Sequence, residues 1–327
     1  MGQYSTKNDE KIIEEKENDY LKYISYNIQG WKKQNENTFI SELSQKDNNN
    51  YDFFCLFDGH NGNEVSQFLK NHFYNEFLNN IKLNPSNIKD AIEKTFIQMN
   101  TLMKTEKGKE EIIKLRKENI KKENKKYKKI LNRNESIIEE LSKEEEEEIL
   151  DYTGCTACLI VIDEKNKKLF FGNIGNSEVL ILGKNDPIIL SSKHRPTDKE
   201  EIDRINAGKE QEIIFNDKVF GILNVKRAFG DFAFIKKNDF EPHITDYNIK
   251  DDDKFIFMGT ESVIECIDKE KIGEIMSNNV NRNKGSLKIT IEQFFENNIS
   301  YDFYDNDTEY GFDNMTCTLI QLKNNND

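Results

Sequence analysis

Short apolar runs alternate along the chain with longer amphipathic stretches. Residues 52–57 (DFFCLF) and 156–162 (TACLIVI) are rich in aromatic and β-branched residues, which is typical of strands. Similar runs occupy residues 168–174, 178–182, 254–259 and 315–320. Several runs are apolar at consecutive positions, so we expect strands that are buried on both faces.

Two segments follow a helical pattern instead. Residues 63–81 and 87–103 place apolar side chains three and four positions apart, which predicts amphipathic helices. A helix of this kind buries its apolar stripe against another element. The pattern therefore predicts an α+β layered fold in which helices cover the faces of the sheets.

The composition indicates that part of the chain lies outside the core. Of the 327 residues, 36% are hydrophobic and 16, about 5%, are glycine. The apolar share is therefore roughly 41%, which is below the roughly 45 to 50% of globular chains. The length would allow two domains, but we expect one large domain over residues 21–322. A flexible polar arm (1–20) and a disordered Asn-rich tail (323–327) would flank it.

Residues 104–150 form a charged insertion in this domain. A strongly basic stretch is followed by five consecutive glutamates, Glu144 to Glu148, and proline is absent. The sparse apolar residues predict long, mostly solvated helices rather than a core element. Two interpretations stay open: an insertion that is tolerated because loop length costs little, and a dedicated binding arm.

The net charge and the cysteines narrow the function classes. The 47 basic and 60 acidic residues give a formal net charge of −13. This charge excludes general, sequence-independent binding of nucleic acid through the overall charge of the protein. No stretch approaches the roughly 18 apolar residues that cross a bilayer, and a signal-peptide core is absent.

Five cysteines, an odd number, indicate reduced thiols in a cytoplasmic protein. Cys155 and Cys158 have the CxxC spacing, but no second pair completes a zinc site.

The first residues fit the MGxxx[ST] pattern of N-myristoylation, with Gly2 as the acylated residue and Thr6 at the hydroxyl position. A chance match is the alternative. One acyl chain binds membranes only marginally, and no polybasic segment follows it. We therefore expect a mainly cytoplasmic protein with a weak membrane-associated fraction.

Acidic residues stand at the ends of predicted strands. Asp58 closes one apolar run, Glu261 follows another and Asp313 precedes the last. Mg²⁺ and Mn²⁺ bind carboxylate and carbonyl oxygens, and one carboxylate can bridge two ions. After Asp58 come Gly59, whose carbonyl can approach a metal, and His60, a proton donor near neutral pH. Taken alone, an Asp-Gly pair is usually a turn signal.

These residues belong to an ordered series of motifs. In chain order the series is QGWK (29–32) with Glu36, CLFDGHNG (55–62), TGCTACLIVID (153–163), GNIGNSEVLIL (172–182), SKHRPTDKEEIDRINAG (192–208), VFGILNVKRAFGDF (219–232) and FDNMT (312–316). It resembles the PP2C (PPM) family of metal-dependent serine/threonine protein phosphatases, over residues 22 to 322. DGHNG, KRAFGD and FDNMT are specific in combination.

The resemblance implies a central β-sandwich of two antiparallel sheets flanked by α-helices, with two Mg²⁺ or Mn²⁺ ions at one edge. His60 matches the residue that protonates the leaving oxygen, and Lys32 stands at the phosphate-binding position. The expected substrates are phosphoproteins, and we expect a monomer. The implied metal residues are Glu36, Asp58, which bridges the two ions, the Gly59 carbonyl, Glu261 and Asp313.

Several positions depart from the family pattern. Lys32 and Lys33 stand where Arg usually follows the Gly-Trp pair, so the charge stays but the bidentate fork is lost. Glu261 replaces a shorter Asp, and Asn37 and Asn176 replace acids near the metals. A misplaced carboxylate penalises Mg²⁺, which demands near-ideal octahedral geometry, so we expect a preference for Mn²⁺.

Two functions stay open. The chain is either a working phosphatase with a weakened metal site, or a catalytically weak or inactive pseudophosphatase that keeps the fold as a binding and regulatory module. Every position of the core metal pair retains an oxygen ligand, which favours the enzyme. The identity of the substrate lies in surface elements that sequence does not specify.

Overall fold

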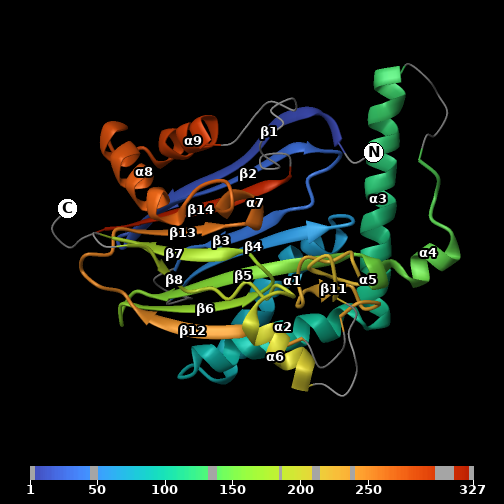
Figure 1. Ribbon diagram of the computed structural model, residues 1–327, viewed down its shortest axis with the longest axis horizontal. Helices are drawn as coiled ribbons and strands as arrows, with labels where there is room; N and C mark the ends of the chain where they lie inside the picture. Colours follow the sequence, from blue (N-terminus) through green and yellow to red (C-terminus); the bar gives the residue numbers. More distant parts are fainter. Residues whose placement is uncertain are drawn as a thin grey trace.

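Two antiparallel β-sheets lie face to face at the centre of the protein, and helices cover both outer faces (Figure 1). The computed structural model describes residues 4–44, 51–131, 138–183, 186–207, 214–235, 240–298 and 313–323. The first sheet has the order β1 (Tyr4–Glu17), β2 (Leu21–Lys32), β14 (Met315–Leu322), β13 (Phe255–Gly259), β7 (Glu178–Leu182) and β8 (Ile188–Ile189). The second has the order β12 (His243–Asn248), β6 (Lys168–Ile174), β5 (Gly154–Asp163), β4 (Tyr51–His60) and β3 (Thr38–Glu42), with β11 (Phe229–Gly230) paired to β5. The predicted α+β sandwich is confirmed.

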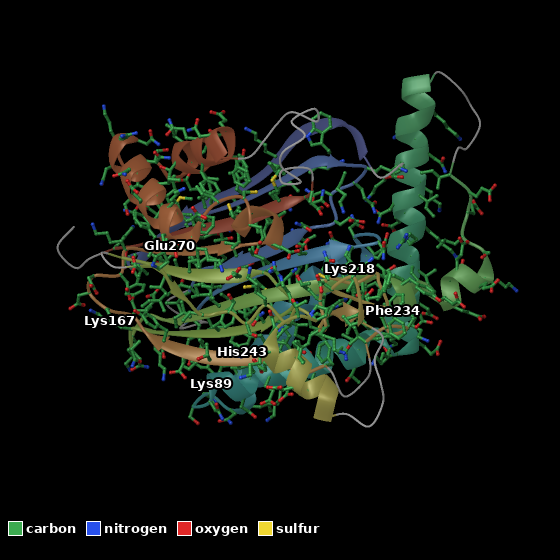
Figure 2. All side chains as sticks on the ribbon, in the orientation of Figure 1. Lys89, Lys167, Lys218, Phe234, His243 and Glu270 are labelled. Atoms are coloured by element: carbon green, nitrogen blue, oxygen red, sulfur yellow. The ribbon has the colours of Figure 1, made fainter. Side chains whose placement is uncertain are left out.

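Two pairs of helices cover the sheets. α1 (Glu64–Leu83) and α2 (Ile88–Met103) pack on the second sheet, and α8 (Lys269–Arg282) and α9 (Leu287–Asn298) pack on the first (Figure 1). Lys89 of α2 forms an ion pair with Asp246 of β12, which joins this helix to the edge of its sheet (Figure 2). The other elements are α3 (Glu106–Leu131), α4 (Lys143–Glu147), α5 (Ile149–Tyr152), α6 (Lys199–Ala207), α7 (Glu261–Ile264), β9 (Ile214–Phe215) and β10 (Lys218–Val219).

Side chains of the central strands alternate between two cores. On β4, Phe53, Cys55 and Phe57 lie in the core that the second sheet shares with α1 and α2. Phe54 and Leu56 lie in the core between the two sheets. Because neighbouring residues of a strand point to opposite faces, both faces of this sheet are covered. The predicted burial of the strands on both faces is confirmed.

The polar N-terminal segment forms strand β1, so the prediction of a flexible arm over residues 1–20 is wrong for Tyr4–Glu17. β1 pairs antiparallel with β2, in continuous register from Lys11 to Glu17. This pairing uses backbone N–H and C=O groups, so a polar composition does not prevent it. In addition, Ile13 packs against the core under α8 and α9.

Two expectations fall on residues that the structure does not describe. Gly2, the candidate acylation site, lies in residues 1–3, and residues 324–327 make up most of the predicted disordered tail. Among the helices of the described ranges, none is long and apolar enough to span a membrane.

The insertion over residues 104–150 is helical, as predicted, but it is not wholly solvated. α3 stands at one end of the sandwich (Figure 1). Its Ile112 is fully buried in the core beside α1 and α2, and Ile149 and Leu150 of α5 belong to the same core. These residues are buried because α3 packs against both α1 and α2. The insertion therefore contributes to the core.

We expect Phe73→Ala to lower the free energy of unfolding by about 3–5 kcal/mol, because it leaves a cavity in this core. The Phe73 side chain is fully buried, and its ring centroid lies 5.5 Å from that of Phe57 and 5.2 Å from that of Phe96. Denaturant unfolding followed by circular dichroism measures the change. Leu83→Ala, at the 84% exposed end of the same helix, is the control, with an expected change below about 0.5 kcal/mol. Equal losses in both variants would contradict this packing.

Candidate functional site

Four strand ends meet at one end of the sandwich. β2 and β4 both end there, and the antiparallel register of β13 with β14 pairs Gly259 with Cys317, which brings the end of β13 beside the start of β14. β14 in turn pairs Met315 with Ile28 of β2. α3 stands at this end of the molecule (Figure 1). The topology therefore brings together the predicted site residues, which are far apart in sequence.

Asp58, Gly59 and His60 form the last three residues of β4, and their backbone is held by β5. Gly59 allows a close approach of the neighbouring loop, because a Cβ at this position would collide with the carbonyl oxygen of Glu36. Any larger residue at Gly59 would push the Glu36 segment away from the strand end. The Asp-Gly-His run is thus a strand terminus that fits against the Glu36 loop.

Hydrogen bonds to its carboxylate and to both of its backbone groups fix Glu36. Its carboxylate Oε1 accepts from the backbone N–H of Gly62 at 2.6 Å, and its carbonyl oxygen accepts from Ser66 Oγ at 2.5 Å. Its own N–H donates to Asn314 Oδ1 at 2.8 Å. The Glu36 carboxylate therefore faces the loop that follows His60.

The Lys32 ammonium lies between two of the predicted metal ligands. Its Nζ is 3.1 Å from Asp313 Oδ1 and 3.6 Å from Glu36 Oε2. Burial opposes the charged form, but Asp313 and Glu36 outweigh it and raise the pKa of Lys32. This cation partly neutralises the carboxylates at the strand ends.

The Asp58 carboxyl is crowded by other acids. Its limited access to water, together with the nearby charges of Asp313 and Glu261, raises the pKa of Asp58 to about 8, although His60 and Lys32 act in the opposite direction. After burial, the charges of Asp313 and Glu261 contribute most to this shift. Such a group favours a nearby cation.

Glu261 is shared with a second cluster of charges. Arg195 Nη2 lies 2.8 Å from Glu261 Oε1 and 2.9 Å from Glu265 Oε1. Lys193 forms ion pairs with the same Glu265 and, at 3.0 Å, with Glu178. One carboxylate oxygen of Glu261 is thus already paired with a guanidinium group.

His60 is positioned by a residue to which the sequence assigned no site role. Its Nε2 lies 2.5 Å from Oδ2 of Asp231, which is fully buried. Burial disfavours a charged imidazole, but the Asp231 carboxylate outweighs it and raises the pKa of His60. The KRAFGD motif contains Asp231, yet the two residues are 171 positions apart, so local pattern does not predict the contact.

Asn314 is a further residue that sequence analysis missed. Its Nδ2 donates to the carbonyl oxygens of Gln29 at 2.7 Å and Gln34 at 3.1 Å, while its Oδ1 accepts from the Glu36 N–H. Asn37 Nδ2 in turn donates to the Asn314 carbonyl at 3.3 Å. Asn314 therefore ties the start of β14 to the loop that carries Glu36. Its place in the FDNMT motif was the available signal.

The described side chains do not form a complete set of metal ligands by themselves. Within the described ranges, no three His, Cys, Asp or Glu side chains lie close enough together to hold a metal ion. Lys32 lies between Glu36 and Asp313, and Arg195 engages Glu261. Of the predicted ligands, Glu36, Asp58 and Asp313 gather around Lys32, and Glu261 approaches Asp58 from the side of α7.

A cavity of about 520 Å³ opens beside these residues. Lys32, Glu36 and His60 line it from the sandwich. The sandwich also contributes Lys33, Gln34, Asn61 and Glu64, and the insertion lines the other side from α3 and from residues 138–145. The sequence predicted a solvated insertion and gave no indication that it would border the site.

Arg116 of α3 joins the insertion to the loop after His60. Its Nη2 donates to the carbonyl of Asn61 at 2.6 Å and to Thr153 Oγ1 at 3.0 Å, and lies 3.0 Å from Glu64 Oε2. The Glu64 side chain is fully buried. Burial raises the pKa of Glu64, and the Arg116 charge opposes this shift.

A family model described as Protein phosphatase 2C matches residues 21–114 and 104–307, which is most of the chain. The chain belongs to the PP2C family of serine/threonine phosphatases. Relatives of full length support this. Probable protein phosphatase 2C 6 of Paramecium tetraurelia is 28% identical, over 99% of this chain and 100% of its own. Probable protein phosphatase 2C 21 of Arabidopsis thaliana is 27% identical, over 100% of this chain and 94% of its own.

Solved structures share the PP2C fold with this chain. The serine-threonine phosphatase 2C from Toxoplasma gondii has a TM-score of 0.67 at 14% identity and covers 97% of this chain and 100% of its own. A C. elegans sex determining protein has a TM-score of 0.65 at 16% identity, over 94% of this chain and 66% of its own. The family and the sandwich fold are thereby confirmed, whereas the roles of individual PP2C site residues stay predictions.

Arg116→Met tests the link between the insertion and the PP2C core. We expect a loss of about 3 kcal/mol in the free energy of unfolding, because the buried Glu64 carboxylate would lose its cation. Adding Glu64→Gln should recover most of this loss, since the buried charge is then removed as well. Chemical denaturation of the single and double variants measures the coupling. Lys114→Met, at an exposed position of the same helix, is the control. A double variant as unstable as Arg116→Met would contradict the pair.

Proposed function

We propose that the protein hydrolyses phosphoserine and phosphothreonine in proteins, in a reaction that requires two Mg²⁺ or Mn²⁺ ions. The observation that carries the proposal is the gathering of Lys32, His60 and three carboxylates at one end of a PP2C sandwich. These groups supply a cation for the phosphate, a proton donor and oxygen ligands at a single place. Phosphoproteins are the proposed substrates.

The donor atoms suit a hard divalent cation. Glu36, Asp58, Glu261 and Asp313 offer carboxylate oxygens and Gly59 offers its carbonyl, which are the ligand types that Mg²⁺ and Mn²⁺ prefer. Crowding of Asp58 by neighbouring acids also favours a cation there. These residues would hold the metals, and Lys32 would give up its place between Glu36 and Asp313.

The chain's own residues then have separate roles. Divalent ions held by these residues would lower the pKa of a water and neutralise phosphate charge. Lys32, no longer needed between the carboxylates, binds a phosphate oxygen as a point charge. His60 donates a proton to the serine or threonine oxygen that leaves, and Asp231 orients its imidazole and favours the charged form.

Mn²⁺ is the ion that this proposal favours. Mg²⁺ demands near-ideal octahedral coordination, whereas Mn²⁺ tolerates an imperfect oxygen site better. Glu261 is one methylene longer than the expected Asp and shares its carboxylate with Arg195. A ligand held in this way suits the less demanding ion.

The pseudophosphatase is the second candidate, and the Arg195–Glu261 ion pair is the observation that favours it. If Glu261 stays with Arg195, one metal loses a ligand. Asn37 and Asn176 add no negative charge to replace it. Cytoplasmic location and a weak membrane fraction through acylated Gly2 stay predictions in either case.

Asp58→Asn should reduce phosphatase activity by at least about 100-fold, because it removes the ligand proposed to bridge both metals. Hydrolysis of p-nitrophenyl phosphate is measured with Mn²⁺, with Mg²⁺ and with EDTA, and the wild type is expected to be most active in Mn²⁺. Asp251→Asn is the control, because Asp251 is exposed and is not one of the proposed site residues. Full activity of a folded Asp58→Asn protein would contradict the proposed metal mechanism. A wild-type protein that is inactive in Mn²⁺ would support the pseudophosphatase.

Lys32→Met separates metal binding from turnover. Removing the ammonium from between Glu36 and Asp313 removes a competing positive charge, so we expect about tenfold tighter Mn²⁺ binding. Activity should fall, because the phosphate loses its cation. Isothermal titration with Mn²⁺ measures the affinity, and Lys114→Met, at an exposed position that does not line the cavity, is the control. Weaker Mn²⁺ binding by Lys32→Met would show that the lysine does not compete.

A further inference from the structure

The cavity beside the proposed chemistry has two unlike sides. On the sandwich side, Lys32, Lys33 and His60 line it, next to the carboxylates that would hold the metals. This is the side that attracts a phosphate group. The far side is formed by the insertion and has the opposite sign.

Glutamates of the insertion make up the acidic side. Glu139, Glu140 and Glu145 line the cavity from the segment that precedes and begins α4, and Glu123 lines it from α3. Glu139 and Glu140 are exposed, and neither forms an ion pair with another residue that the structure describes. The lining therefore presents negative charge to whatever enters the cavity.

Apolar side chains lie between the two charged sides. Ile120 of α3, Ile138 and Leu141 all line the cavity and are partly buried. Lysine and arginine side chains have long aliphatic stems that pack on such surfaces while their charged ends reach carboxylates. The side of the cavity that the insertion forms, called the wall below, thus offers contacts for both the stem and the charged end of a basic side chain.

Hydrogen bonds and an ion pair hold the acidic segment in place. Asn124 Nδ2 donates to the Ile138 carbonyl at 2.8 Å, and the Ile138 N–H donates to Asn124 Oδ1 at 2.9 Å. Lys117 and Glu146 form an ion pair at 2.5 Å. Arg116 joins α3 itself to the loop after His60. The wall is therefore fixed relative to the catalytic end before a substrate binds.

Lysines of the insertion line a second cavity, whereas Arg116 of the insertion lines the first cavity and is paired there with Glu64. Lys121, Lys125 and Lys128 border this second cavity, of about 580 Å³, which Glu139 and Glu140 also line. None of these lysines is part of the lining of the first cavity. Glu139 and Glu140 thus border both cavities, while Lys121, Lys125 and Lys128 border only the second.

On this basis we propose that the insertion selects phosphoserine and phosphothreonine segments with lysine or arginine next to the phosphorylated residue. The proposal rests on the proposed function, because it places the phosphate at Lys32 and His60. A cavity of about 520 Å³ accommodates a phosphorylated side chain and parts of its neighbours. Basic neighbours then meet Glu139 and Glu140, whereas acidic neighbours are repelled.

Two matched phosphothreonine peptides test the proposal, one with arginine and one with glutamate on both sides of the phosphorylated residue. In Mn²⁺ the wild type should have a kcat/KM at least about tenfold higher for the arginine peptide. The Glu139→Gln/Glu140→Gln variant should lower this ratio to below about threefold, and added salt should lower it in the wild type. The ratio of the two peptides cancels any change in the chemical step.

Glu144→Gln/Glu147→Gln is the matched control. Both glutamates belong to the same acidic segment and are exposed, but neither lines the cavity. This variant should keep the wild-type ratio. An equal loss of preference in the two double variants would reduce the effect to net charge and overturn the proposed wall.

A binding measurement separates this proposal from the proposed function. The same two peptides, made with a non-hydrolysable phosphonate and a fluorescent label, are titrated with the wild type in Mn²⁺ and followed by fluorescence polarisation. Tighter binding of the arginine peptide, lost in Glu139→Gln/Glu140→Gln, supports the wall even if no peptide is hydrolysed. Turnover without a preference, or a preference for the glutamate peptide, overturns the wall and leaves the phosphatase proposal intact.

Discussion

Negative charge is concentrated at one end of the sandwich, and the arrangement there depends on the cations that balance it. Glu36, Asp58 and Asp313 come together because the strand registers fix the end of β4 and the start of β14, and hydrogen bonds hold the Glu36 loop beside them. Burial, together with the charges of Asp313 and Glu261, raises the pKa of Asp58. Lys32 lies among them, and Arg195 holds Glu261 at the side. Each cation thus joins backbone segments that would otherwise repel one another.

The same constraint shapes the insertion. Glu64 is fully buried at the start of α1 and is compensated by Arg116 of α3. A buried charge without a partner is costly, so this pair fixes where α3 lies relative to the loop after His60. The insertion is therefore joined to the end of the sandwich that carries His60 by the Arg116–Glu64 ion pair as well as by the packing of Ile112 in the core.

The parts of the molecule that the sequence predicted are those with a local signal. Runs of apolar residues define strands, and short motifs place Asp58 and Asp313 at strand ends. The missed parts depend on partners distant in sequence. β1 pairs through its backbone, the contact of His60 with Asp231 spans 171 positions, and the insertion borders the cavity only because it folds back across the strand ends.

Strand β1 also sets a limit on where the chain can be shortened. It is the edge strand of the first sheet and satisfies one row of backbone groups on β2. A protein that began at residue 21, where the composition changes, would keep every residue of the proposed chemistry. It would also present β2 as an open edge, which is a template for pairing between molecules. The charged β1 thus takes the edge position that the more apolar β2 would otherwise occupy.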